Sequence, residues 1–228
     1  MKYGKIVSGT FIRRVNRFMA EVFVNGTKEV VHIKNTGRLQ ELLHPNVEVL
    51  LEYKSSPNRK TKFSLISVVK NNRWVNIDSQ APNTVVYEAL RAGKVIEFGY
   101  VNEVKREVKY GNSRFDLSLK KDDQQCFIEV KGVTLEQNGV AMFPDAPTKR
   151  GTKHVLELVN AVQNGFDGVI LFVVQMEGCM FFTPHKEMDW EFADALKFAT
   201  SNGVKILAYD SIVNEDELIL KGPIPVQL

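Results

Sequence analysis

The fold of this chain is indicated first by residues 113–135, which read SRFDLSLKKDDQQCFIEVKGVTL. This stretch predicts two neighbouring strands, of which the first carries Asp116 and the second carries Glu129 and Lys131. Since strand side chains alternate in direction, Glu129 and Lys131 share one face, and Asp116 can reach that face from the preceding strand. Two carboxylates beside one ammonium group can hold a hard divalent cation and activate a water molecule next to it.

The sequence around the Glu-Val-Lys triplet at residues 129–131 distinguishes it from the other copies of this triplet. The same triplet occurs twice more, in a polar stretch upstream where alternating charges are ordinary on a solvated strand. The copy at 129–131 lies in the apolar run 126–133, and charged residues in a buried strand need a partner or a metal ion. The pattern favours a site over an internal salt bridge, which remains the alternative. It resembles the active-site pattern of the PD-(D/E)xK nucleases, and this resemblance implies that Asp116, Glu129 and Lys131 are catalytic.

The composition is that of an ordinary soluble globular protein. Of the 228 residues, 44% are hydrophobic and 25% are charged, which suits one large domain or two small ones. The longest apolar run, residues 169–174, is far shorter than the roughly 20 residues that span a bilayer, and no basic-then-apolar leader opens the sequence. The only cysteines, Cys126 and Cys179, are expected to be buried and reduced. We therefore expect a cytoplasmic protein without a membrane segment, and neither zinc-ligand spacing nor a Cys/His nucleophile pair is present.

The net charge of +3 is unevenly distributed along the chain. Residues 1–80 hold 14 Lys and Arg against 6 Asp and Glu, a net charge of +8, whereas residues 81–228 hold 16 against 21, a net charge of −5. A basic part joined to a mildly acidic part suggests that the first meets a polyanion while the second carries carboxylates that bind metal.

The N-terminal part predicts a small β-barrel. Asn25-Gly26 is a strong hairpin signal between two apolar strands. The expected elements are strands over residues 4–14, 18–24 and 29–33, a short helix over 38–43, and strands over 47–54 and 61–69. This is the order of elements in an OB-fold, so we expect an OB-fold nucleic-acid-binding domain over residues 1–80.

The expected barrel carries cationic and aromatic residues that suit a nucleic acid. OB barrels bind single strands by combining a cationic groove with aromatic platforms. The alternative is that the aromatic residues are core and the charges only solubilise the chain, but three arginines within residues 13–17 favour an anionic partner. The nucleic-acid-binding residues predicted in this part are Arg13, Arg14, Arg17, Arg59 and Lys60.

Residues 81–228 predict an α/β domain. Asn83 is expected to cap a first helix over 84–91, and Thr148 is expected to cap a second helix that runs to 164. The other expected elements are strands over 103–110, 114–119 and 126–133, an extended piece to 143, strands over 168–175 and 180–183, a helix over 189–200 and a strand over 204–209. This αβββαβ order is associated with restriction-endonuclease-like, PD-(D/E)xK domains, and it agrees with the position of the carboxylate motif.

Five further residues extend the predicted site. Glu88 lies on the first helix, from which nucleases of this type often contribute an acid, and is a predicted metal ligand; an exposed helix carboxylate is the alternative. A carbonyl oxygen near Val130 is a further predicted ligand. Arg150, Lys153 and His154 lie at the start of the second helix, where basic side chains and backbone donors can hold a phosphate. A histidine such as His154, taken alone, is more often structural.

The chain also resembles one family, the sugar fermentation stimulation protein A family. The segments that carry the resemblance are Arg17-Phe18, Asn35-Thr36-Gly37, Asn83 with Glu88-Ala89, Glu107–Gly111, Ser113-Arg114, Asp116, Cys126–Leu135, Phe143–Ala146, Arg150-Gly151, Lys153-His154, Glu157-Leu158 and Ile206–Tyr209. The resemblance implies an OB-fold followed by a PD-(D/E)xK-like domain, nonspecific DNA binding and a regulatory role in sugar metabolism of the maltose type. The chain departs from the expected patterns at Phe115, where nucleases often have proline, and at Lys149, where the family has an acid.

Two functional classes follow from these observations. In the first, the chain is a metal-dependent nuclease in which Asp116, Glu129 and Glu88 bind Mg²⁺ or Mn²⁺ and Lys131 acts on the attacking water or the phosphate. In the second, the chain is a regulatory factor that binds DNA without cutting it. No helix-turn-helix signal is apparent, so DNA binding is expected to be largely nonspecific in sequence.

Overall fold

Six strands of the N-terminal part close into a barrel in the computed structural model, which describes all residues except 36, 55–59, 112 and 122. The strands are β1 (Lys5–Asn16), β2 (Met19–Val24), β3 (Thr27–Ile33), β4 (Glu48–Tyr53), β5 (Phe63–Lys70) and β6 (Arg73–Asn76). Their order is β3-β2-β1-β4-β5-β6, and a parallel pairing of β3 with β5 closes the barrel. The predicted OB-fold barrel is confirmed by this order.

Two tight hairpins of the barrel have the same physical origin. Asn25 and Gly26 have φ angles of 49° and 78°, and Asn71 and Asn72 have φ angles of 51° and 59°. Two-residue hairpins that match the twist of a sheet need positive φ at both positions, which Asn and Gly tolerate best. The first hairpin was predicted. The second, between β5 and β6, was missed, although its Asn-Asn pair was the available signal.

The predicted helix over residues 38–43 is wrong. These residues form a single turn, in which the amides of Leu42 and Leu43 donate to the carbonyl oxygen of Leu39 at 3.1 and 2.9 Å. Leu39 has a φ of 51°, which a right-handed helix cannot contain. The turn buries Leu39 and Leu42 in the barrel core. This burial stabilises the segment, which does not continue as a helix.

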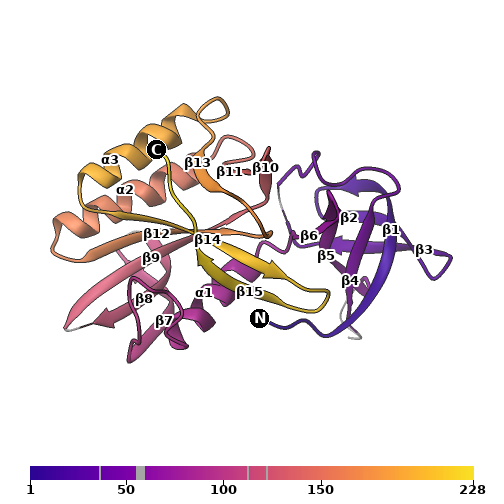
Figure 1. The fold of residues 1–228 in the computed structure, drawn as a ribbon, viewed down its shortest axis with the longest axis horizontal. Coiled ribbons are helices and arrows are strands. Elements are labelled where there is room, and N and C mark those ends of the chain that lie inside the picture. The colour runs from indigo at the N-terminus through magenta and orange to yellow at the C-terminus, as the bar shows by residue number, and fades with distance from the viewer. Residues whose placement is uncertain (36, 55–59, 112, 122) are drawn as a thin grey trace.

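A second six-stranded sheet has the order β15-β14-β12-β9-β8-β7 (Figure 1). Its strands are β7 (Glu103–Tyr110), β8 (Ser113–Lys121), β9 (Gln124–Val133), β12 (Asp167–Val174), β14 (Lys205–Val213) and β15 (Leu218–Pro223). The pairings of β9 with β12 and of β12 with β14 are parallel, and the others are antiparallel. A small sheet of β10 (Leu135–Gln137), β11 (Val140–Phe143) and β13 (Phe181–Pro184) lies beside it. The edge strand β15 was not predicted.

Helices cover both faces of the second sheet. Helix α1 (Ala81–Arg91) packs in one apolar cluster with Ile128 and Val130, whereas α2 (Lys149–Gln163) and α3 (Trp190–Ser201) pack in another with Phe127 and Phe172. The side chains of Thr148 and Asp189 cap α2 and α3. The predicted αβββαβ order is confirmed, with Glu129 on the α2 face of β9.

The predicted helix cap at Asn83 is wrong. Helix α1 begins at Ala81, and the residue before it, Gln80, makes no side-chain cap. Pro82 occupies the first turn, where its missing N–H costs nothing and its fixed φ suits a helix. Asn83 therefore lies inside the helix, and its side chain is available for another contact.

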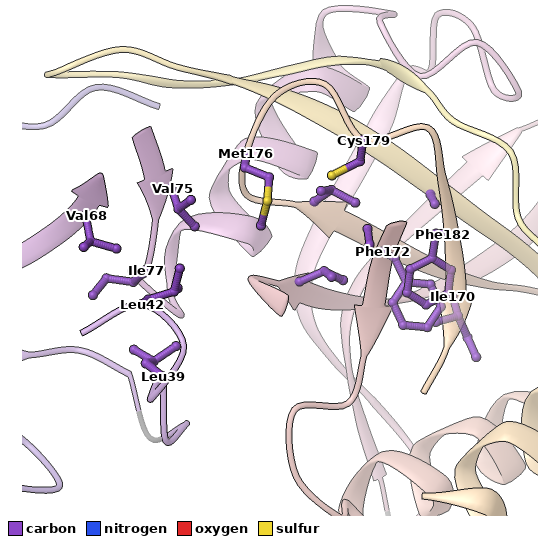
Figure 2. Close-up of a cluster of buried hydrophobic side chains, with 14 of the residues drawn as sticks. Leu39, Leu42, Val68, Val75, Ile77, Ile170, Phe172, Met176, Cys179 and Phe182 are labelled. Carbon is purple, nitrogen blue, oxygen red and sulfur yellow. The ribbon is translucent and has the colours of Figure 1, made fainter. Parts of the chain in front are cut away.

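The core of the barrel continues into the layer beneath α2 and α3. Figure 2 shows Val75 and Ile77 on the barrel side of this cluster and Met176, Phe172 and Phe182 on the other side. All five side chains are fully buried. The barrel is thus fixed beside the second sheet by apolar packing. Among the described residues, no helix has the length and apolar character to cross a membrane.

Candidate metal and nucleic-acid site

Strand β8 separates from β9 at Asp116. The paired register runs from Leu117 opposite Ile128 to the far end of the two strands and does not include Asp116. One carboxylate oxygen of Asp116 accepts a hydrogen bond from the main-chain amide of Val130 at 2.8 Å, and the other accepts one from Nδ2 of Asn83 at 2.7 Å. The carboxylate is therefore fixed at the opening between the two strands. The Val130 amide in β9 holds one oxygen, and Asn83 in α1 holds the other.

Glu129 lies next to this opening and is only 2% exposed. Its Oε1 atom accepts a hydrogen bond from Nζ of Lys131 at 2.5 Å and contacts Nδ1 of His154, which α2 brings over the sheet. Its Oε2 atom has no hydrogen-bond partner within the described parts of the chain, although it is fully buried. A buried carboxylate oxygen without a partner costs free energy, and a hard cation is one group that would satisfy it.

The two carboxyl groups have pKa values that move in opposite directions. Burial raises the pKa of Asp116 above its ordinary value, and the charge of Glu129 raises it further. Burial alone would raise the pKa of Glu129 as well, but the contact with His154 and the charge of Lys131 outweigh it, so this pKa is lowered. Glu129 is thus kept ionised, whereas at Asp116 the charge of Lys131 is outweighed by burial and by the charge of Glu129.

The oxygen atoms at this opening fit a hard divalent cation. The amide and carbonyl of one strand residue point to the same side, so the carbonyl of Val130 lies on the side where its amide meets Asp116. Asp116, Glu129 and this carbonyl supply the oxygen ligands that Mg²⁺ prefers, with water completing its shell. In the part of the chain that the structure describes, no three Asp, Glu, His or Cys side chains gather closely enough to hold an ion by themselves.

The structure places Glu88, the predicted metal ligand on α1, away from the opening. Its carboxylate forms an ion pair with the amino group of Met1 at 2.7 Å, and that amino group also donates to the carbonyl of Leu218 in β15. Glu88 lies five positions after Asn83 on the helix, which corresponds to a rotation of about 140° around the helix axis. Because Asn83 faces Asp116, Glu88 faces away from it, and its side chain is 52% exposed.

The barrel arginines differ in what they can bind. Arg13 is paired with Glu21 through two hydrogen bonds, of 2.9 and 3.1 Å. Arg14 was predicted to contact nucleic acid, but it is a structural residue. Its five N–H donors make hydrogen bonds to the carbonyl oxygens of Asn16, Arg17, Asn35, Gly37 and Arg38. An arginine has five donors in total, so Arg14 has none left for a phosphate.

The other predicted cations of the barrel are exposed or undescribed. Arg17 is exposed, with its guanidinium 5.8 Å from the ring centre of Phe18. Lys60 is exposed as well. Arg59 lies outside the residues that the structure describes.

Helix α2 presents its three predicted phosphate-binding residues in different directions. His154 points inward to Glu129, and Nε of Arg150 lies 3.5 Å from Nε2 of His154, so Arg150 lies beside the carboxylate opening. Lys153 is exposed and, with Lys149, lines a hollow that Tyr110 shares on the outer side of the helix. The sequence did not predict the contact of Asn83 with Asp116, because Asn83 was expected to be a helix cap.

Comparison with known proteins agrees with this architecture. Two family models match the chain: the SfsA N-terminal OB domain over residues 12–77, and the sugar fermentation stimulation protein RE domain over residues 80–217. A sugar fermentation stimulation protein homolog of Alkaliphilus oremlandii is 53% identical over 225 residues, covering 96% of each chain. The homolog of Clostridium beijerinckii is 48% identical over 228 residues and covers 100% of each chain.

A solved structure gives the same result for the fold. The structure of Pyrococcus furiosus SfsA in complex with Ca²⁺ superimposes with a TM-score of 0.91 at 28% identity, and the match covers 100% of this chain and 98% of that one. The chain therefore belongs to the sugar fermentation stimulation protein family, and it combines an OB-fold barrel with a restriction-endonuclease-like α/β fold.

Proposed function

We propose that this protein binds DNA largely without sequence preference and cleaves phosphodiester bonds with Mg²⁺ or Mn²⁺ held at Asp116, Glu129 and the carbonyl of Val130. The observation that carries the proposal is the buried, unpartnered Oε2 atom of Glu129 beside Asp116, whose pKa is raised by burial and then by the charge of Glu129. The relative from Pyrococcus furiosus, described in complex with Ca²⁺, supports a hard divalent ion in this family.

Each side chain around the opening has a defined part in this proposal. A bound divalent ion would polarise the phosphate and lower the pKa of a water molecule. Lys131, whose ammonium group reaches Glu129 at 2.5 Å, would orient the attacking water or stabilise charge on the phosphate. His154 holds the Glu129 carboxylate from α2, and Asn83 holds that of Asp116 from α1. Arg150 would bind the phosphodiester at the opening, and Lys153 would contact the nucleic acid on the outer side of α2.

The proposed DNA binding is electrostatic. Residues 1–80, which we propose as the nucleic-acid-binding domain, carry a net charge of +8, and residues 81–228, the proposed nuclease-like domain, carry −5. Exposed Arg17 and Lys60 offer phosphate contacts on the barrel. Such contacts predict similar affinity for unrelated DNA sequences and a steep loss of affinity with salt. A salt-independent preference for one sequence by more than about a thousandfold, as dedicated regulators have, would contradict this part of the proposal.

A second function is supported by the ion pair within the site. Glu129 already has Lys131 at 2.5 Å, and the described side chains include no cluster of three metal-ligating groups. Such an internal pair is consistent with a DNA-binding factor that regulates sugar metabolism of the maltose type without cutting DNA, and the family description names sugar fermentation. In that case the cluster would only stabilise the fold.

The compartment that we propose is the cytoplasm. Cys126 and Cys179 are both free and buried. Reduced, unpaired cysteines are the state that a reducing compartment maintains.

A cleavage assay with matched variants separates the two functions. Linear duplex, single-stranded and branched DNA would be incubated with the protein and Mg²⁺ or Mn²⁺, and chelated samples would serve as blanks. We expect metal-dependent cleavage by the wild type and by Glu88→Gln, whose carboxylate lies outside the site. We expect none by Asp116→Asn, while its DNA binding is retained. Wild-type protein that binds metal and DNA but cuts none of these substrates would favour the regulatory function.

A further inference from the structure

A hollow on the barrel surface lies beside the turn between β1 and β2. Arg17 and Arg38 are exposed at its edge, and Leu39 and Leu43 contribute apolar lining. Its volume is about 590 Å³, within the range of roughly 300–1,000 Å³ in which proteins hold small organic groups. We refer to it as the arginine hollow.

The arginine hollow is preformed. Arg14 lies in its wall, and its guanidinium holds the β1–β2 turn and the segment before Leu39 together through hydrogen bonds to the five carbonyls named above. Gly37 is fixed further, because its amide donates to Oδ1 of Asn35 at 2.7 Å. A site whose walls are fixed before binding loses little conformational entropy when a ligand enters.

The two exposed arginines at the edge of the hollow have no ion-pair partner among the described residues, and the nearest carboxylate in its wall is that of Asp145, against Gly37. Within the described residues, neither the Arg17 nor the Arg38 guanidinium makes a hydrogen bond or an ion pair. Burial lowers the pKa of Arg14, and the charge of Arg17 lowers it further, so these cations already repel each other. An anion at the edge of the hollow would relieve this repulsion and accept the forked donors of both exposed arginines.

An aromatic ring adjoins the same charges. Phe18 is 48% exposed, and the guanidinium of Arg17 lies 5.8 Å from its ring centre. Exposed aromatic rings next to arginines are the usual stacking surface for an unpaired base. An anion-binding edge, an apolar lining and a stacking surface together match a nucleotide, which has a phosphate, a sugar and a flat base.

The hollow adjoins the segment that leads into α2. Oδ2 of Asp145 lies against the backbone of Gly37, only 2.6 Å from the position that a Cβ atom would take there. Asp145 lies between β11 and α2, and α2 carries Arg150 and His154. The segment that leads into α2 therefore lies against the wall of the arginine hollow.

We propose that the arginine hollow binds one unpaired nucleotide of a nucleic-acid strand. Arg17 and Arg38 bind its phosphate, and the base packs on Phe18 and on the half-buried side chain of Leu43. A base inside a duplex is stacked and paired, so the hollow gives a preference for single-stranded or gapped nucleic acid. The inference rests on the proposed function in one respect: the strand bound in the hollow is taken to be the same strand that enters the catalytic opening.

The test is an equilibrium binding measurement in EDTA, so its result is independent of cleavage. Fluorescein-labelled oligo-dT and a duplex of equal length would be titrated with the wild type, with the double variant Arg17→Gln/Arg38→Gln, and with Phe18→Ala. The charge-matched control is Lys105→Gln/Lys197→Gln, which removes two exposed cations remote from the barrel. The measured quantity is the ratio of affinities for single strand and duplex.

We expect the wild type and the control to prefer the single strand. The arginine double variant and Phe18→Ala should each lose about fivefold or more of that preference, the scale of one lost stacking contact. A ratio that stays within about twofold of the wild type in both hollow variants would overturn the proposal. If free dAMP displaced oligo-dT at the concentrations at which oligo-dT binds, the hollow would be a site for free nucleotides. This result would also overturn the proposal.

Discussion

Two groups of buried carboxylates in this molecule differ in their partners. At the joint between the barrel and the second sheet, Glu136 has both Lys70 and Arg73 at 2.9 Å, and the fully buried Asp78 has Lys34 at 2.7 Å. At the opening between β8 and β9, the half-buried Asp116 lies beside the buried Glu129, and Lys131 and His154 both contact Glu129. Asp78 and Glu136 at the joint each have a cation, whereas Asp116 at the opening forms no ion pair with any described residue.

This difference separates a structural role from a functional one. Burial would raise the pKa of Glu136, but its hydrogen bond with Lys70 and the amide of Gly139 outweigh it, so the pKa is lowered. The pKa of Asp116 is raised, by burial first and by Glu129 second. Paired buried charges hold elements in one arrangement, whereas an unbalanced carboxylate pair stores repulsion that a cation can relieve.

Breaking the joint should have the largest effect on stability. Lys34→Met leaves the buried Asp78 carboxylate without the cation that lies 2.7 Å from it. We expect the free energy of unfolding to fall by about 3 kcal/mol, as is typical when one partner of a buried ion pair is removed. Urea unfolding followed by circular dichroism measures this change.

The matched control is Lys105→Met, whose partner Glu103 is exposed like Lys105 itself. Exposed pairs contribute about 0–1 kcal/mol, so this variant should remain near the wild type. Equal losses in the two variants would remove the distinction between buried and exposed pairs on which the comparison depends.

Removing one charge from the opening should act in the opposite direction. Asp116→Asn keeps the shape of the side chain but abolishes its repulsion with Glu129. We expect the metal-free protein to gain roughly 1 kcal/mol in unfolding free energy, the scale on which functional sites are commonly stabilised by substitution. Thermal unfolding in EDTA checks the sign, and a clear loss of stability would show that Asp116 is primarily a structural hydrogen-bond acceptor.

The smallest effect is expected in the acid range, at the joint. Because the folded-state pKa of Glu136 lies below its ordinary value of 4.5, its contribution to stability is present above pH 4.5 and is lost as the pH falls through the folded value. The stability of Glu136→Gln should therefore depend less on pH in this range than that of the wild type. Urea midpoints between pH 6 and pH 3 would measure the two slopes, and parallel slopes would contradict the lowered pKa.

The parts of the fold with local signals could be predicted from the sequence. The Asn25-Gly26 hairpin and the Thr148 cap depend on residues adjacent in the chain, and both predictions are confirmed. Strand β15 is a short edge strand that forms by pairing with β14. Its own sequence carries little signal for a strand. The division into domains at residue 80 stays a prediction, since one apolar cluster includes residues from both sides of it.

The candidate site was predicted in its residue types but not in all of its contacts. The strand motif placed Asp116, Glu129 and Lys131, because alternation along a strand can be read from sequence. The contact of Asn83 with Asp116 joins residues 33 positions apart, which no local pattern reports. The structural role of Arg14 could not be read either, since its partners are main-chain carbonyls that any sequence would supply.

Calorimetric titration with Mn²⁺ tests the central claim most directly, because it measures the proposed metal site without requiring cleavage. The wild type and Glu88→Gln should bind one ion with the same affinity, since the Glu88 carboxylate is paired with Met1 away from the opening. Asp116→Asn and Glu129→Gln should each lose that binding while remaining folded. The assignment of a metal to the opening at Asp116 and Glu129 would be contradicted by either of two results. The wild type would fail to bind the ion, or both site variants would still bind it.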